Sequence, residues 1–486
     1  MQTDRPTLAI VGGGASGALV AAHVVRETRS VPRVVLVERS GKVGAGTAFA
    51  SGPKCHLLNV PARSMSAFEA DPDHFARWLG MQGVTDAADS FVPRTLYGCY
   101  LREALWPRGQ DRSADAVVEA VHGEVVDIGT GPQGHQLVMD DGRCLGATAV
   151  VLATGIVMRG LPSTLAGLAT HGRCIVNPWA PGALATIGPS ATVVLLGSGL
   201  TAVDVLLALR ESGHRGAVHA VSRHGLLPRA HRAQDHRNEA LARLCRDLAG
   251  TQVRTLLRRA RQILGATAAE GTDWRDMVDA MRPLVPSLWR DLGPDEQQRF
   301  RRHLERLWSI NRHRMAPQVG QAVDELRDSG ILHVHAGEVR CASDVDGALR
   351  LGVKLPSRER PYTWTADWLV NCTGTDPQLF GNRQPLMDTL RARGLAGPGP
   401  LNVGVATDDR GRVLNDRGRP LGWLWAIGSL RQGQLWESTA IPEIRAQARQ
   451  AALDILRFLG NAPLVSGGTN YAEGASAILP AGPPTG

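Results

Sequence analysis

The segment Gly12-Gly13-Gly14-Ala15-Ser16-Gly17 follows the apolar run Leu8 to Val11, and together they decide how the first part of the chain folds. Gly12 allows a tight turn from strand to helix, Gly14 lets backbone amides approach a phosphate, and Gly17 permits close helix packing. An acidic residue, Glu38, stands at the end of the next apolar run. This spacing predicts a strand–helix–strand unit that binds a dinucleotide, with its phosphates at the positive end of the helix.

A second segment, Gly197-Ser198-Gly199-Leu200-Thr201-Ala202, repeats the pattern, with Ala202 in place of the third glycine after Gly197 and Gly199. Here Arg223 stands at the end of the next apolar run. A carboxylate such as Glu38 accepts hydrogen bonds from ribose hydroxyls, whereas the guanidinium of Arg223 suits a 2′-phosphate. We therefore predict an α/β fold with two Rossmann-like dinucleotide-binding domains, the first for FAD and the second for NADPH. The alternative that either turn only joins a strand to a helix stays open, because glycine-rich turns occur in many folds.

The composition fits a soluble globular protein of two or three domains, since 486 residues are 43% hydrophobic and 21% charged. Seven cysteines without a C-x-x-C pair argue against a disulfide framework, a dithiol centre and a zinc ribbon, and we expect no metal site. The net charge of +8 comes mainly from scattered arginines, which suits anionic cofactors and substrates better than nucleic acid. We expect no leader peptide and no membrane span, hence a cytoplasmic protein, and the oligomeric state stays open.

Apolar runs that end in glycine divide the rest of the chain. The predicted FAD domain starts with residues 1–180, where the run Val150 to Ala153 leads to Gly155 at the ligand-binding edge of a sheet. Residues 181–230 and 331–374 form the predicted NADPH domain. Residues 375–460 return to the FAD domain through a run that ends at Gly428, and residues 461–486, rich in Gly, Ala, Pro and Ser, form a tail that is predicted to be disordered.

Residues 231–330 are predicted to be a helical insertion in the NADPH domain. Apolar residues recur there three and four apart with arginines between them, over segments 239–248, 253–264 and 296–310. The region is too long to be a loop. It either covers the active site or serves as a packing or dimerisation element.

Several short segments between residues 46 and 79 carry a family resemblance when combined with the two turns. The segments are Gly46-Thr47-Ala48-Phe49, His56-Leu57-Leu58-Asn59-Val60-Pro61-Ala62, Met65-Ser66-Ala67-Phe68 and Phe75-Ala76-Arg77-Trp78-Leu79, with Arg312-His313-Arg314-Met315 and Trp436-Glu437-Ser438-Thr439-Ala440 further on. With them the chain resembles the flavoproteins that include bacterial FAD-dependent urate hydroxylases and the aspartate N-monooxygenases that form nitrosuccinate. The resemblance covers roughly two fifths of the chain.

This resemblance implies an FAD-dependent, NADPH-consuming monooxygenase that hydroxylates a small, anionic, nitrogen-containing metabolite through a C4a-hydroperoxyflavin. Urate, converted to 5-hydroxyisourate, is the first candidate, because the aspartate N-monooxygenases are longer chains. L-aspartate or another amine, hydroxylated on nitrogen, is the alternative. An NADPH-dependent flavin reductase or dehydrogenase without oxygen insertion, and a catalytically silent FAD-binding protein, also stay open.

Candidate catalytic residues are Asn59, His56 and Arg314. Asn59 and His56 lie in the segment expected near the flavin ring, and an amide can both donate and accept at a flavin edge; a structural loop histidine is the alternative for His56. Arg314, with Arg63 and Arg312, offers bidentate contacts to a substrate anion, and a surface role is the alternative for each. The chain departs from many related flavoproteins at Ser429, where they have an aspartate that binds ribityl hydroxyls.

Overall fold

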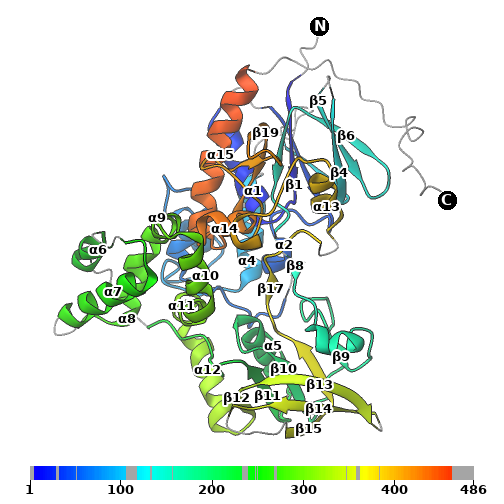
Figure 1. The fold of residues 1–486 in the computed structure, drawn as a ribbon, viewed down its shortest axis with the longest axis vertical. Helices are drawn as coiled ribbons and strands as arrows, with labels where there is room; N and C mark the ends of the chain where they lie inside the picture. Colours follow the sequence, from blue (N-terminus) through cyan, green and yellow to red (C-terminus); the bar gives the residue numbers. More distant parts are fainter. Residues whose placement is uncertain are drawn as a thin grey trace.

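The structure, a computed structural model, describes residues 5–28, 32–50, 52–105, 118–131, 134–155, 157–232, 239–246, 248, 250–267, 271–345, 347–356, 362–381 and 384–461. Two sheet-containing domains lie one above the other in Figure 1, and a block of helices lies beside their junction. The predicted tail lies outside the described residues, apart from Asn461 at the end of the last helix. None of the helices in these ranges is long and apolar enough to cross a membrane.

The first domain is built on a sheet with strand order β18-β19-β7-β1-β2-β3. All neighbours are parallel except the edge pair β18 and β19. Because β19 pairs with β7, a segment far along the chain joins the sheet that contains β1. The strands are β1 (Thr7–Val11), β2 (Arg33–Glu38), β3 (Val118–His122), β7 (Ala149–Leu152), β18 (Arg412–Leu414) and β19 (Pro420–Ala426).

Both faces of this sheet are covered, which explains why its central strands are apolar throughout. Leu8 and Ile10 of β1 pack into a core with α1 (Ala15–Arg26), α4 (Arg94–Leu105) and α15 (Ile441–Asn461), while Ala9 and Val11 pack into a second core on the opposite face. That second core includes α13 (Pro385–Ala392) and a three-stranded antiparallel sheet made of β4 (Val125–Gly131), β5 (Gly134–Met139) and β6 (Cys144–Ala147). Successive side chains of β1 alternate between the two cores, because the pleat of a strand points neighbouring side chains to opposite faces of the sheet.

The second domain contains a parallel sheet with strand order β12-β11-β10-β16-β9. Its strands are β9 (Cys174–Ile175), β10 (Val193–Leu196), β11 (Val218–Ser222), β12 (Leu332–Ala336) and β16 (Trp368–Asn371). One face packs on α5 (Leu200–Glu211) and α12 (Pro317–Asp328), and the other on an antiparallel ribbon of β13 (Glu338–Val345), β14 (Ala348–Lys354) and β15 (Tyr362–Ala366). The predicted fold class, α/β with two Rossmann-like domains, is confirmed.

Two of the predicted domain boundaries are wrong by one element each. The range 1–180 for the start of the first domain includes β9, yet β9 pairs with β16 in the second sheet. The range 231–330 for the insertion includes α12, yet Val319, Val323 and Leu326 of this helix are buried in the core of the second domain. The chain crosses between the domains at β8 (Val157–Met158) and β17 (Thr375–Asp376), which pair with each other.

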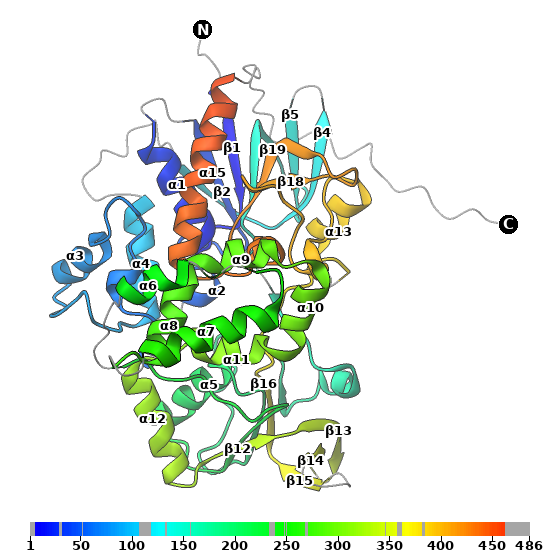
Figure 2. The same cartoon turned by 60° about the vertical axis from the view of Figure 1, so that its left-hand side comes forward.

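The helical insertion packs around two small cores, one of which also includes Trp436 of the C-terminal segment, and it lies at the junction of the two domains (Figure 2). Trp289 of the insertion stacks on Trp436 of the C-terminal segment, with ring centroids 4.5 Å apart, and its Nε1 donates to the Gly433 carbonyl at 2.8 Å. The expected helix 296–310 is broken at Leu304. The helices are α6 (Glu239–Arg246), α7 (Val253–Thr267), α8 (Trp274–Met281), α9 (Val285–Asp291), α10 (Pro294–His303) and α11 (Glu305–Arg312).

The remaining short elements lie in the connections. They are α2 (Gly46–Phe49), η1 (Ala62–Ser64), α3 (His74–Met81), η2 (Ser163–Leu168), η4 (Arg282–Leu284), η5 (Pro400–Asn402), η6 (Gly428–Arg431) and α14 (Gln432–Leu435). The last two lie between β19 and α15. The chain leaves α14 through Trp436, whose φ of 59° is unusual for a residue with a side chain.

Candidate functional site

The first glycine-rich turn is required by packing at two of its positions. Gly12 has a φ of 104°, and a Cβ there would lie 2.4 Å from the Ala153 carbonyl oxygen. A Cβ on Gly17 would lie 2.0 Å from the carbonyl oxygen of Gly12. A side chain at either position is therefore incompatible with the turn, as expected for a βαβ unit of this kind.

Gly14 is different, because the protein itself leaves room for a side chain there. It is the N-cap residue of α1, and a Cβ would meet only Gly46 Cα, at 3.4 Å, which is an ordinary contact. The first turn of α1 contains no acidic residue. The open space beside Gly14 therefore faces a helix N-terminus with free capacity for an anion, which fits the pyrophosphate of FAD.

Three hydrogen bonds hold the carboxylate of Glu38 in place at the end of β2. Its Oε2 accepts from the Gly13 amide at 2.8 Å, and its Oε1 accepts from the amide and the hydroxyl of Ser40 at 3.0 and 2.8 Å. The residue is 8% exposed, so these contacts fix the orientation of a largely buried carboxylate. Oε2 accepts only one of these bonds, so it can accept a further hydrogen bond, and a ribose hydroxyl would supply it.

The other two glycines of the predicted FAD site end neighbouring strands. Gly155 follows β7, and Gly428 follows β19, which pairs with β7. Gly428 has a φ of 70°, and a Cβ there would lie 2.6 Å from Ser16 Oγ in the first turn of α1. The backbone after β19 therefore approaches the first glycine-rich turn closely. Ser429 comes directly after it in η6.

The second turn has the same backbone design. Gly197 has a φ of 121°, and a Cβ there would lie 2.3 Å from the Cys372 carbonyl oxygen. Gly199 is the N-cap residue of α5, and Ala202 is fully buried in the helix packing, where its methyl group is accommodated. A Cβ on Gly199 would come no closer than 3.9 Å to any atom, and that atom is Nη1 of Arg306. Space for a phosphate group is therefore present here too.

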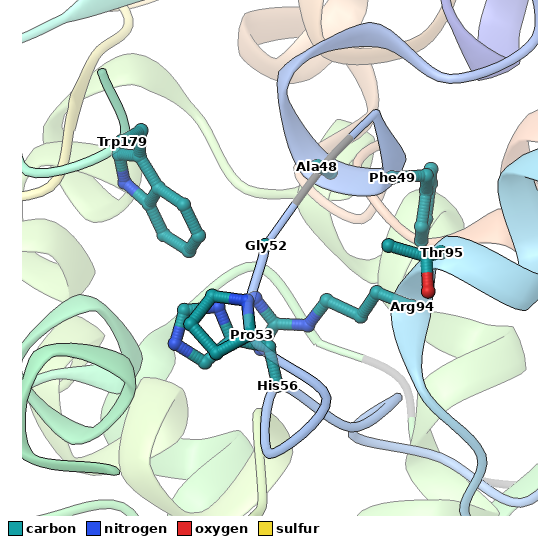
Figure 3. Close-up of a pocket in the computed structure, with 8 residues that line it drawn as sticks. All are labelled: Ala48, Phe49, Gly52, Pro53, His56, Arg94, Thr95 and Trp179. Carbon is teal, nitrogen blue, oxygen red and sulfur yellow. The ribbon is translucent and has the colours of Figure 1, made fainter. Parts of the chain in front are cut away.

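His56 lies in a small pocket at the domain boundary, which is lined by Ala48, Phe49, Gly52, Pro53, His56, Arg94, Thr95 and Trp179. Figure 3 shows the Arg94 side chain extending toward His56, with Trp179 on the opposite side of the pocket from Phe49. His56 Nε2 donates to the backbone carbonyl of Asp204 in α5, at 2.9 Å. This contact joins the two domains, and a catalytic role for His56 stays a prediction.

Asn59 is connected to the helical insertion through its backbone. Its carbonyl oxygen accepts from His231 Nε2 at 2.9 Å, and the neighbouring Ala230 carbonyl accepts from Arg275 Nε at 3.0 Å. Asn59 is half-buried. The segment expected near the flavin is therefore linked, through His231 and its neighbour Ala230, to Arg275, which belongs to a group of arginines on and beside α8.

Arg314 belongs to this group and is only 1% exposed. One of its nitrogens, Nη2, pairs with Asp279, whereas Nε and Nη1 are buried without a hydrogen-bond partner in the described part of the chain. Arg275 pairs with Asp273 at 3.0 Å, and Arg232 pairs with Asp276 at 3.0 Å. Arg314 therefore offers two donor nitrogens to a negatively charged group in a region that is already rich in arginine.

Arg312, which the sequence presented as an anion ligand, is 4% exposed and already paired. Its Nε and Nη2 both lie 3.1 Å from Glu437 Oε2. Trp308 Nε1 donates to the other oxygen of this carboxylate at 2.9 Å. Burial, and then the charge of Arg312, lower the pKa of His313 to about 4, so His313 is neutral near pH 7. Arg312, the last residue of α11, thus holds the segment around Glu437 against the insertion.

Arg63 differs from the other two predicted arginines. It forms an ion pair with Asp89, whose side chain is 75% exposed. A partner this exposed places the Arg63 pair at the surface, where ion pairs contribute little. Arg63 therefore fits the surface alternative rather than a role in binding substrate.

Arg94, Asp204 and Arg306 are residues at these sites that sequence reasoning missed. None of them belongs to a local motif, and each acquires its neighbours from a distant part of the chain. Arg94 donates from Nη1 and Nη2 to both carboxylate oxygens of Asp204, at 2.8 and 3.0 Å. Arg306 comes from the insertion and contacts the second turn.

Comparison with known proteins supports the first domain directly. Residues 9–157 match the family described as FAD-NAD(P)-binding. Over 263 residues the chain is 31% identical to an L-aspartate N-monooxygenase (nitrosuccinate-forming) from Streptomyces cremeus. This similarity covers 45% of the present chain and 39% of the relative, so the chain spans about two fifths of the length of that curated protein.

Solved structures share the whole fold at low sequence identity. Ornithine hydroxylase from Pseudomonas aeruginosa, in its reduced form, superposes with a TM-score of 0.64 at 16% identity, covering 94% of this chain and 100% of that one. Ornithine N-hydroxylase from Kutzneria sp. 744, described with reduced FAD, NADP+ and L-ornithine, gives 0.63 at 16% identity, covering 93% and 99%. The chain therefore has the two-dinucleotide-domain fold of these flavoproteins, and its first domain is of the FAD-NAD(P)-binding kind.

Proposed function

We propose that this chain is an FAD-dependent, NADPH-consuming monooxygenase that hydroxylates the amine nitrogen of a small substrate carrying at least one carboxylate. The observation that carries the proposal is the sequence similarity to the aspartate N-monooxygenase, which falls on a chain with two intact dinucleotide turns. The ornithine hydroxylases share the fold and also act on an amino acid. These relatives favour the amine alternative over urate, the first candidate from the sequence, which they do not support.

The tasks of the protein in such a reaction are binding, orientation and exclusion of water. Bound FAD, once reduced by NADPH, supplies the activation of molecular oxygen. Gly14 and the N-terminus of α1 would hold the FAD pyrophosphate, and Glu38 would hold the ribose of its adenosine. Gly199 and the N-terminus of α5 would hold the NADPH pyrophosphate, with Arg223 at the 2′-phosphate. The insertion, which packs on Trp436, would cover the site between the domains.

The substrate carboxylate is proposed to bind Arg314. Its Nε and Nη1 nitrogens are buried and have no hydrogen-bond partner among the described residues, and leaving charged donors unsatisfied is costly unless a ligand supplies the acceptors. The link from Asn59 through His231 and Ala230 to Arg275 supports a position for these arginines close to the segment expected at the flavin. An N-hydroxylation requires the neutral amine, because a protonated amine has no lone pair to attack oxygen. A carboxylate held on the arginines would leave that amine free to point elsewhere.

A disulfide reductase is disfavoured as the second candidate. All seven cysteines lie in the described ranges and are free thiols, without a C-x-x-C pair. Cys372, next to the second turn, is fully buried, and this burial raises the pKa of its thiol. An NADPH oxidase that releases only hydrogen peroxide is a further alternative. The product analysis in the next paragraph distinguishes it from the proposed enzyme.

The test is a substrate panel with the FAD-loaded protein, NADPH and air. L-aspartate, L-ornithine, L-lysine and urate are compared by mass spectrometry for products that have gained one oxygen atom, together with NADPH oxidation. We expect an oxygenated amine in proportion to the NADPH consumed. If every compound yields only hydrogen peroxide, or if urate alone is oxygenated, the proposal fails.

Arg314→Met checks the substrate site within this assay. It removes the two donors, so we expect the KM for the substrate to rise by roughly ten- to a hundredfold while the KM for NADPH stays unchanged. Arg327→Met is the matched control, because Arg327 is exposed on α12 and forms a surface pair with Asp324 at 3.6 Å.

A further inference from the structure

We propose that Arg306, which the helical insertion carries, is a ligand for the pyrophosphate of the nucleotide at the second turn. The inference deepens the proposed function and rests on it in one respect, that the second turn binds a pyridine nucleotide. It assigns to the insertion a direct part in coenzyme binding. The insertion then completes the nucleotide site of the domain that it interrupts.

The position of Arg306 is the first reason. It lies near the start of α11, which Figure 2 shows close to α5 at the boundary between the insertion and the second domain. Its Nη2 lies 3.1 Å from the hydroxyl and 3.4 Å from the carbonyl oxygen of Ser198, and it also donates to the Leu226 carbonyl. Its Nη1 is the atom nearest to the open space at Gly199. The guanidinium therefore lies directly beside the place where a pyrophosphate would meet the turn.

The local charge is the second reason. In the described ranges, no carboxylate lies within 4.0 Å of either Arg306 or Arg223, and the first turn of α5 contains no acidic residue. Burial, followed by the charge of Arg223, lowers the pKa of Arg306, so the two cations are close enough to repel each other. The positive end of α5 adds to the same potential. A doubly charged anion at this point would relieve that repulsion, and a pyrophosphate is such an anion.

The two arginines face different parts of the nucleotide. Arg223 follows β11 and is exposed, at the place where a 2′-phosphate is expected. Arg306 faces Gly199, where the pyrophosphate common to NADPH and NADH is expected. Loss of Arg223 should therefore act only on the phosphorylated coenzyme, and loss of Arg306 should act on both coenzymes.

Calorimetric titration of the FAD-loaded protein with NADP+ and NAD+ tests this division. In Arg306→Ala we expect the Kd values for both coenzymes to rise by a similar factor, roughly ten- to a hundredfold. Arg306→Lys keeps the charge but not the planar fork, so it should recover part of the affinity for both. Arg223→Ala is the matched control and should weaken NADP+ alone.

A titration with a third compound, 2′-AMP, separates loss of a ligand from collapse of the turn. The compound 2′-AMP carries the 2′-phosphate without a pyrophosphate, so Arg306→Ala should bind it as the unmodified protein does. Unchanged Kd values for both coenzymes in Arg306→Ala, an effect on NADP+ alone, or loss of 2′-AMP binding would each overturn the inference. Wild-type protein that binds neither coenzyme would overturn it as well. Absence of a hydroxylated product would not, because that outcome concerns only the proposed reaction.

Discussion

Arg94 and Asp204 join the two nucleotide domains through a two-point ion pair, with N–O distances of 2.8 and 3.0 Å. Arg94 begins α4 of the first domain, and Asp204 lies in α5 of the second. Their side chains are 17% and 7% exposed. Because the Asp204 carbonyl also accepts from His56, both the side chain and the backbone of α5 are fixed to the first domain near its dinucleotide turn.

Arg94→Met should lower the thermal unfolding temperature and slow the reduction of FAD by NADPH. The substitution leaves the Asp204 carboxylate buried without its partner, which costs about 3–5 kcal/mol for a fully buried pair and less for this one. Stopped-flow absorbance of the flavin gives the reduction rate. The double variant Arg94→Met with Asp204→Leu should regain thermal stability, but its rate of FAD reduction should stay low. A single variant as stable and as fast as wild type would show that the pair does not position the domains.

Gly14→Ala and Gly17→Ala should behave in opposite ways. A methyl group at Gly14 fits the protein but enters the space proposed for the FAD pyrophosphate, so the variant should fold and purify with little FAD; Gly14→Val should abolish FAD binding. At Gly17 the methyl group would lie 2.0 Å from a carbonyl oxygen, so the variant should not fold. Flavin absorbance per protein and circular dichroism measure both effects. Full FAD occupancy in Gly14→Val would contradict the assignment of the first turn.

Arg223→Ala should remove the preference for NADPH over NADH. Loss of a charge-assisted contact to the 2′-phosphate should cost about 1.5–3 kcal/mol, which is roughly a tenfold to a more than hundredfold change in affinity. Steady-state kinetics with each coenzyme measure the preference. Since His224 is the exposed neighbour, His224→Ala serves as the control. Equal losses with NADPH and NADH in Arg223→Ala would assign the 2′-phosphate to another residue.

His219 should make the second domain less stable in mild acid. Its Nδ1 lies 3.1 Å from His335 Nε2, and its ring stacks on His333 at 4.9 Å. Burial, then the charges of His333 and His335, lower the pKa of His219 to about 4. In the unfolded chain this histidine binds its proton near pH 6.5. Between pH 6.5 and about 4 the unfolded state therefore binds more protons than the folded state, and the free energy of unfolding decreases as the pH is lowered.

His219→Phe should therefore flatten the dependence of the unfolding temperature on pH within that window. The exposed His224→Phe is the comparison, and it should keep the slope of the wild-type protein. Fluorescence-detected thermal unfolding from pH 4 to pH 7 gives both slopes. Identical slopes in His219→Phe and wild type would mean that the histidine stack does not resist protonation.

The two turns could be predicted from the sequence because the demands on their glycines are local. At Gly12 and Gly197 a positive φ and a neighbouring strand end exclude any side chain, and these requirements follow from the strand–turn–helix connection itself. Strand runs such as Val193 to Leu196 are apolar because both faces of the sheet are covered.

What could not be predicted depends on segments that are distant in the sequence. Nothing near Arg306 or Arg94 in the chain indicates that one meets Ser198 and the other meets Asp204. The short strand β9 has only Cys174 and Ile175, too few residues for an alternating pattern, so its membership of the second sheet is decided by pairing with β16. Likewise α12 looks like the helices before it, and only its buried face assigns it to the second domain.

The helical insertion touches both halves of the molecule, through Trp289 against Trp436 on one side and Arg306 against Ser198 on the other. This double attachment limits how the protein can diversify. A region that shapes a substrate pocket usually varies freely among relatives, because loops and insertions tolerate change. Here, a chimera that exchanged residues 239–312 to alter substrate choice would also exchange the proposed coenzyme contact of Arg306, so substrate choice and coenzyme affinity are expected to evolve together.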